Sequence, residues 1–207
     1  ITPKALTITG ITAENKVYDG NTTAVVNTTA VNSTSLVGMG LVAGDNLTVT
    51  ATGVFADKNV ANNKVVALNS TYSGTDAGNY NITSQVNTTA NITAKALTIS
   101  GITAANKEYN GCTTATVSTA GVNSTSMVAM GLVAGDTVTL TTTGAFASKN
   151  VGNSTVVMLT STYGGADAGN YNIASQTFTQ ADITPKALTI SGITANNKVY
   201  DGCTTAT

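Results

Sequence analysis

The chain has 207 residues and almost no net charge, because nine basic side chains are balanced by ten acidic ones. Only 9% of the residues are charged, whereas 42% are hydrophobic. Disordered chains combine low hydrophobicity with high net charge, so this composition predicts folded domains. Near-neutrality also argues against nucleic acid or an anionic membrane as a partner, since both are recognised through basic surfaces.

The composition predicts an all-β protein, because Thr and Val favour strands and strong helix formers are sparse. Turn residues such as Asp19-Gly20 and Ser73-Gly74 separate the expected strands. Alternation of Leu or Ile with Thr predicts antiparallel pairing with one solvent-exposed face. The stretch 35–43 is compatible with a short helix or a loop. In chain order the strands expected in the first repeat are 5–9, 16–18, 23–27, 46–52, 64–72 and 80–92.

The sequence repeats itself with a period of 91 residues, starting at Ile1, Ile92 and Ile183. This period is too long for a solenoid turn and has the size of a small domain. We therefore expect tandem Ig-like β-sandwich modules at 1–91 and 92–182, followed by the start of a third repeat at 183–207. The third segment is too short to be stable alone. We expect it to pair with strands of the preceding module or of another chain.

The residue types argue against an enzyme. The chain has no His, so the usual general base and the Ser-His-Asp and Cys-His arrangements are missing. Carboxylates occur mainly where turns favour Asp, and the chain has no cluster of Cys and His residues such as zinc requires. We expect no cofactor, with calcium at Asp76, Asn79 and Asn81 as the alternative to a hydrogen-bonded turn. No apolar run approaches the roughly 20 residues of a membrane-spanning helix.

Lys4, Lys58 and Asn59 recur in the second copy as Lys95, Lys149 and Asn150, which permits a lysine–asparagine crosslink as one hypothesis. That chemistry needs a carboxylate beside the pair, and Asp57 is replaced by Ser148 in the second copy. The alternative is a surface lysine at a strand end.

Cys112 and Cys203 occupy equivalent positions of consecutive repeats, so they are expected to lie one module length apart. A disulfide needs Cα atoms within about 7 Å, which argues against an intrachain bond. The thiols either stay reduced or form an interchain disulfide in an oxidising compartment. The chain also has ten N-x-[ST] sequons, which permit glycosylation. They are headed by Asn21, Asn27, Asn32, Asn46, Asn69, Asn81, Asn87, Asn91, Asn123 and Asn153.

Four motifs follow one another in the first copy: K-x-YDG, AGD, FADKNV and DAGNY. In this order they resemble the YDG-type repeat of large bacterial surface adhesins of the filamentous-haemagglutinin kind. The second copy departs from the pattern with YNG at 109–111 and FASKNV at 146–151, so a role that needs Asp19 or Asp57 is not common to both copies.

The resemblance implies an extracellular or cell-surface protein and transfers no catalytic residue. The expected function is a structural segment of an adhesin, stalk or filament whose partners are copies of itself. A host or neighbouring cell surface is a further expected partner. The alternative is a module that binds glycans or proteins through loops or Tyr-bearing faces, with Tyr18, Tyr72 and Tyr80 as candidates in the first copy. Tyrosines that close the edge of a sandwich would equally explain these residues.

Overall fold

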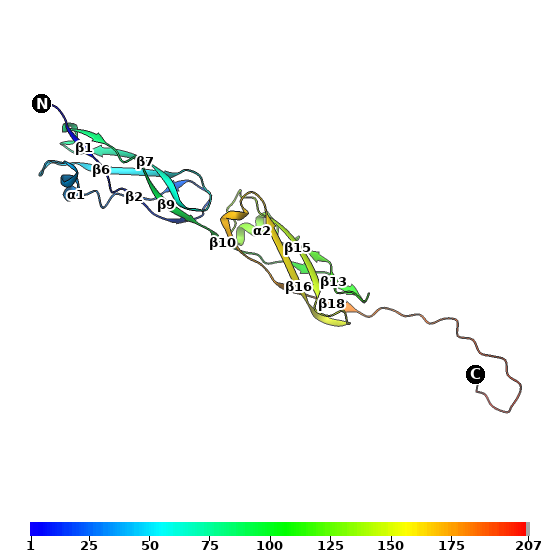
Figure 1. Cartoon of the computed structure of the whole chain (residues 1–207). Helices are drawn as coiled ribbons and strands as arrows, with labels where there is room; N and C mark the ends of the chain where they lie inside the picture. Colours follow the sequence, from blue (N-terminus) through cyan, green and yellow to red (C-terminus); the bar gives the residue numbers. More distant parts are fainter. Residues whose placement is uncertain (206–207) are drawn as a thin grey trace.

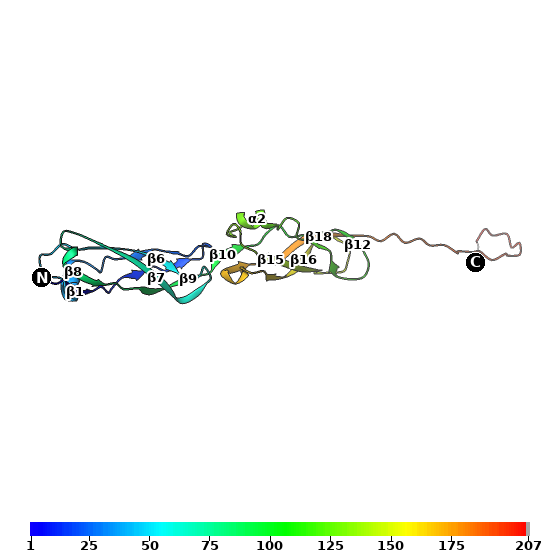
Figure 2. The same ribbon diagram turned by 90° about the horizontal axis from the view of Figure 1, so that it is seen from above.

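The computed structural model describes residues 1–205 and contains two modules of the same β fold, arranged end to end (Figure 1). We call residues 4–93 module 1 and residues 95–184 module 2. Figure 2 shows the same elongated arrangement from above, with the C-terminal segment extending beyond module 2. Residues 1 and 205 therefore lie at opposite ends of the molecule.

Module 1 consists of nine strands, one α-helix and one 3-10 helix. They are β1 (Lys4–Thr7), β2 (Thr12–Ala13), β3 (Lys16–Val17), β4 (Thr23–Ala24), β5 (Val26–Asn27), α1 (Ser33–Met39), β6 (Thr48–Phe55), β7 (Ala61–Ser73), η1 (Ala77–Asn79), β8 (Tyr80–Thr83) and β9 (Asn87–Thr93).

Module 2 repeats this order. Its elements are β10 (Lys95–Thr98), β11 (Thr103–Ala104), β12 (Lys107–Glu108), β13 (Thr114–Ala115), β14 (Val117–Ser118), α2 (Ser124–Ala129), β15 (Thr139–Phe146), β16 (Gly152–Gly164), η2 (Ala168–Asn170), β17 (Tyr171–Ala174) and β18 (Phe178–Thr184). The prediction of a mostly β protein with a repeat of about 90 residues is thus confirmed.

Each module has one five-stranded sheet and two two-stranded sheets. In module 1 the large sheet has the order β3-β9-β7-β6-β4, and the small sheets are β1-β8 and β2-β5. The expectation of antiparallel pairing holds for β6, β7 and β9, but β1 pairs with β8 and β3 pairs with β9 in parallel. The parallel pairs arise because β1 and β3 are joined to their partners by most of the module rather than by a hairpin.

Two local differences from the sequence prediction concern the ends of elements. The undecided stretch 35–43 contains most of helix α1, whose N-cap Asn32 accepts hydrogen bonds from the N–H groups of Thr34 and Ser35. Residues 84–86 interrupt the expected strand 80–92, which becomes β8 and β9. The first difference reflects a capping box in which Ser35 also bonds back to the Asn32 N–H.

The hydrophobic core follows the alternation seen in the sequence. Leu6, Ile8 and Leu36 pack with Tyr80 at the N-terminal end of module 1. A second cluster contains Tyr18, Phe55 and Ile92 of module 1 together with the whole core of module 2. The apolar core of module 2 is therefore continuous with the C-terminal half of module 1.

The segment after module 2 is extended. Ile183 and Thr184 pair with Lys107 and Glu108 at the end of β18, so the first two residues of the expected third repeat belong to module 2. Residues 185–205 are exposed and form no helix or strand. The expected strand pairing thus extends only to Thr184, and pairing of the remainder with another chain stays a prediction; residues 206–207 of this segment lie outside the described residues. Within residues 1–205, no helix is long and apolar enough to cross a membrane.

Candidate functional site

The most elaborate cluster of polar side chains lies where the two modules meet. A single residue, Ala94, separates β9 of module 1 from β10 of module 2. Two loops of module 1 contact module 2: the one after β3, with Tyr18 and Gly20, and the one between β6 and β7, with Lys58. We call this contact region the junction.

Asp136 is the centre of the junction. It lies in the loop between α2 and β15, and its side chain is only 4% exposed. Its Oδ2 atom accepts hydrogen bonds from the hydroxyl groups of Tyr18 (2.7 Å) and Tyr171 (2.6 Å). The Lys58 Nζ atom donates to Oδ1 at 2.8 Å. Two module 1 side chains and one module 2 side chain therefore satisfy a nearly buried carboxylate, as a buried charge requires.

Lys58 bridges two carboxylates of module 2. Besides Asp136, it contacts the Asp167 Oδ1 atom at 2.9 Å, and Asp167 Oδ2 accepts the Thr137 N–H at 2.9 Å. The Lys58 Nζ atom also lies 5.9 Å from the centre of the Tyr18 ring, within the range of a cation–π contact. The lysine thus joins three side chains from two modules.

A second set of hydrogen bonds runs beside the charged cluster. Asn170, at the end of η2, is 4% exposed. Its Oδ1 atom accepts the Val60 N–H at 2.9 Å, and its Nδ2 group donates to Asn59 Oδ1 at 3.2 Å. The Asn170 side chain of module 2 therefore bonds to both the backbone and a side chain of the same module 1 loop.

Apolar packing completes the junction. Tyr18 is 1% exposed, and its ring packs edge-on against that of Tyr171, with centroids 5.5 Å apart. Gly20 has a positive φ of 81°, and Val133 lies so close that its Cγ1 atom would be 2.8 Å from any Cβ at position 20. A side chain at this turn would disturb both the backbone and the contact.

The charges of the cluster are mutually stabilised. Burial acts to raise the pKa of Asp136, but hydrogen bonds from Lys58, Tyr171 and Tyr18 outweigh it and hold this pKa below its ordinary value. The hydrogen bond from Lys58 also lowers the pKa of Asp167, and the two carboxylates raise that of Lys58. Burial and then Asp136 raise the pKa of the Tyr18 hydroxyl. All four groups keep their charge state around neutral pH, which suits a permanent contact rather than proton transfer.

Family comparison explains why the same residues occur twice. The sequence profile of the YDG domain matches residues 2–89 and 93–178, which together make up most of the chain. The chain belongs to the YDG domain family. Neither the comparison with curated proteins nor that with solved structures found a match. Both YDG modules carry identical residues at the ten junction positions: Tyr18, Gly20, Val42, Asp45, Lys58, Asn59, Val60, Asp76, Asn79 and Tyr80 recur 91 positions later.

The two cysteines of the YDG repeats are both free and exposed. Cys112 follows β12 of module 2, and Cys203 lies in the extended segment. The Cys112 N–H donates to Asn110 Oδ1 in the turn that replaces the YDG motif. An interchain disulfide at either position stays a prediction.

The sequons are accessible. Of the ten asparagines, eight are exposed, and Asn27 and Asn91 are half-buried. Asn32 and Asn123 use their Oδ1 atoms to cap α1 and α2, and Asn21 Oδ1 accepts the Thr23 N–H. Glycosylation stays a prediction at all ten sites.

Of the candidate calcium residues, Asp76 has its side chain engaged within a turn. Asp76 Oδ2 accepts the Asn46 N–H at 2.8 Å, while Asn79 ends η1 and Asn81 lies in β8. Among residues 1–205, no group of three or more His, Cys, Asp and Glu side chains is arranged to hold a metal ion. The turn interpretation accounts for the Asp76 side chain.

Sequence reasoning singled out Lys58 and Asn59, but for a crosslink within one module. In the structure both side chains contact the next module instead, Lys58 through carboxylates and Asn59 through Asn170. Sequence reasoning missed the junction altogether. The one available signal was that these positions stay identical while Asp19 and Asp57 change between copies.

Proposed function

We propose that the chain is a structural segment of an extracellular stalk, adhesin or filament, in which YDG modules act as rigid spacers. The junction carries this proposal. A tether between independent domains needs no buried charge, whereas Asp136 is almost completely buried between the modules and accepts bonds from Lys58 and Tyr18. Such a contact holds the modules in one fixed orientation.

The head-to-tail geometry of the junction also favours a linear array of modules. The two surfaces of the junction are different and lie at opposite ends of a module, and each module carries the residues of both. Head-to-tail contacts between unlike surfaces do not close on themselves, so they produce linear arrays. Repetition of this contact would lengthen the rod by one module at a time.

The remaining features of the proposal rest on the family and on the residue types. The Ig-like sandwich for each module and the relation to filamentous-haemagglutinin-like adhesins are proposed from the motif order, and the cell-surface location follows from that relation. A non-enzymatic role is proposed because the charged groups of the junction are paired with one another. The binding alternative has less support, since the candidates Tyr18 and Tyr80 are buried and the half-buried Tyr72 donates its hydroxyl to Ser84 Oγ.

The test measures whether the two modules tumble as one body. Backbone ¹⁵N relaxation of the full chain should give both modules a common, elongated diffusion tensor. Replacing Lys58 with Ala should separate the two correlation times, because Asp136 and Asp167 lose their shared cation. Lys149→Ala, at the same position of module 2 but exposed, is the matched control and should leave the tensor unchanged. Independent tumbling of the modules in the unmodified chain would overturn the proposal.

A further inference from the structure

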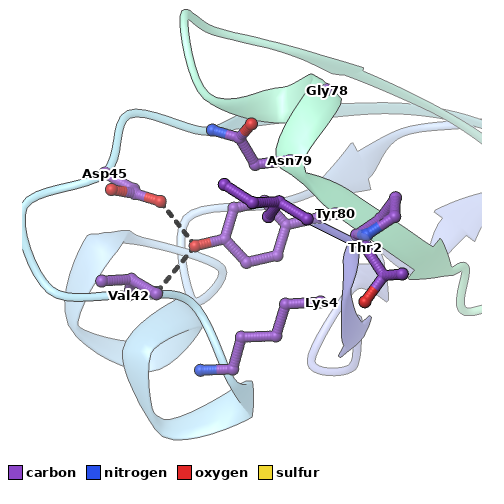
Figure 3. Close-up of a pocket in the computed structure, with 9 residues that line it drawn as sticks. Thr2, Lys4, Val42, Asp45, Gly78, Asn79 and Tyr80 are labelled. Carbon is purple, nitrogen blue, oxygen red and sulfur yellow. Dashed lines mark hydrogen bonds between the residues drawn. The ribbon is translucent and has the colours of Figure 1, made fainter.

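A pocket of about 350 Å³ lies at the N-terminal end of module 1. Figure 3 shows the Tyr80 ring at its centre, with Asp45 and Val42 on one side, Thr2 on the other and Lys4 below. Gly78 and Asn79, from η1, complete the labelled residues. The pocket is at the opposite end of module 1 from the junction.

This pocket has the same side chains and the same internal bonds as the module 2 side of the junction. The Tyr80 hydroxyl donates to Asp45 Oδ2 at 2.6 Å and accepts the Val42 N–H at 2.9 Å. The corresponding bonds of Tyr171 to Asp136 and Val133 have the same lengths, 2.6 and 2.9 Å. The surface is thus formed in module 1 without a module docked on it.

The partners that module 1 supplies to module 2 are missing at this pocket. Asn79 is exposed, whereas the equivalent Asn170 is buried beneath Val60 and Asn59. Among the described residues no lysine forms an ion pair with Asp45 or Asp76, whose equivalents share Lys58. The Asp45 carboxylate and the Asn79 amide therefore line the pocket without the partners that their equivalents receive from the preceding module at the junction. Asp76, two residues before Gly78, likewise has no lysine partner within residues 1–205.

We propose that this pocket is a docking socket for the distal end of a further YDG module. The proposal deepens the proposed function, on which it rests, by assigning the surface and the partner through which the rod is extended. The occupant would insert a tyrosine hydroxyl beside Asp45 and a lysine between Asp45 and Asp76. A loop backbone N–H would reach Asn79. Each group has its counterpart at the observed junction.

The distal end of module 2 carries the matching groups in open form. Tyr109 is half-buried, whereas its equivalent Tyr18 is 1% exposed at the junction. Lys149 and Asn150 are exposed, and Val151 is 50% exposed. The distal end of module 2 thus presents the exposed Lys149, and the pocket of module 1 presents the Asp45 carboxylate, so these two groups have opposite charges.

The test adds a copy of residues 1–91 directly before Ile1, so that Asn91 precedes the isoleucine as it does in the natural repeat. Gly20 and Val133 provide the reference, since a Cβ at Gly20 would lie 3.8 Å from Val133 Cβ, the usual separation in a disulfide. In the extended chain, Gly20→Cys of the added module is combined with Val42→Cys of module 1. Cys112 and Cys203 are changed to Ser in every variant.

The control pair combines the same Gly20→Cys change with Ala43→Cys. Ala43 is the neighbour of Val42 but lines a separate hollow with Ser33 and Thr34. Oxidation in a glutathione buffer is followed by mass spectrometry. We expect the 20–42 pair to have an effective concentration at least about tenfold above that of the 20–43 pair, because a docked module holds only the first pair in bonding geometry. Lys58→Ala in the added module should reduce this difference.

The outcomes separate the two proposals. If the 20–133 pair crosslinks in the original chain but the 20–42 pair does no better than its control, the socket is overturned and the rigid junction stands. A small molecule or another protein would then be the occupant of the pocket. Independent tumbling of the two modules in ¹⁵N relaxation, and not failure of the 20–133 pair alone, would overturn the proposed function, because a side chain at Gly20 itself strains the turn. Preferential crosslinking of the 20–42 pair supports the socket.

Discussion

Tyr18 provides the sharpest test of the junction, because Tyr109 offers the same residue at an unoccupied position. Tyr18→Phe keeps the ring that packs against Tyr171 and removes only the hydroxyl that donates to Asp136 at 2.7 Å. A hydrogen bond to a charged group contributes about 1.5–3 kcal/mol. In Tyr109→Phe we expect a change within about 0.5 kcal/mol, as at most surface positions.

The assay is thermal unfolding of the full chain at neutral pH. For a cooperative unit of about 150–250 residues, each kcal/mol shifts Tm by about 2–4 °C, so Tyr18→Phe should lower Tm by about 3–12 °C. In an Asp136→Ala background the same substitution should have a much smaller effect, because the acceptor is gone. Equal Tm values for Tyr18→Phe and Tyr109→Phe would refute the role of this hydroxyl in joining the modules.

Three further predictions concern pH, redox state and packing. Since the pKa of Asp136 is lowered in the folded chain, its contribution to stability is complete above the unfolded pKa near 4 and is lost as pH falls through the folded pKa. Between pH 6 and pH 2, the free energy of unfolding in urea should therefore fall more steeply with decreasing pH than it does in Asp136→Asn. Parallel pH profiles for the two proteins would contradict this prediction. The exposed thiols of Cys112 and Cys203 should give, on oxidation, a ladder in non-reducing electrophoresis that collapses with reductant, whereas a single unchanged band would indicate inert thiols. Gly53→Ala should lower the free energy of unfolding by about 1–3 kcal/mol, because its Cβ would lie 2.6 Å from Val26 and 2.8 Å from Val66. Gly78→Ala, with open space around it, should leave the urea midpoint unchanged. Equal midpoints for the two variants would contradict this packing.

The local signals in the sequence were sufficient for the class and for most strands. Alternation around Leu6 and Ile8, and around Leu47 and Val49, reports burial directly, and all four side chains are buried. Turn residues such as Gly20, with its φ of 81°, mark the strand ends because few other residues adopt that conformation. These features depend on neighbours in the chain, so they can be read from one sequence.

The parallel pairs and the junction could not be read in this way. Lys4 pairs with Tyr80 across 76 residues, and no local pattern encodes the direction of such a contact. Tyr18 and Asp136 are 118 residues apart, and each has a plausible role within its own module as an edge tyrosine or a turn aspartate. Only the three-dimensional arrangement of two modules brings these residues together.

The parallel pairing of β3 with β9 has a mechanical consequence. The chain enters module 1 through β1 and leaves it through β9, which lies between β3 and β7 in the sheet. Tension applied to the two ends would pull β9 along its own axis, so its hydrogen bonds to both neighbours would be loaded together in shear rather than broken one after another. Because Ala94 alone separates β9 from β10, that load would pass to the next module with almost no slack.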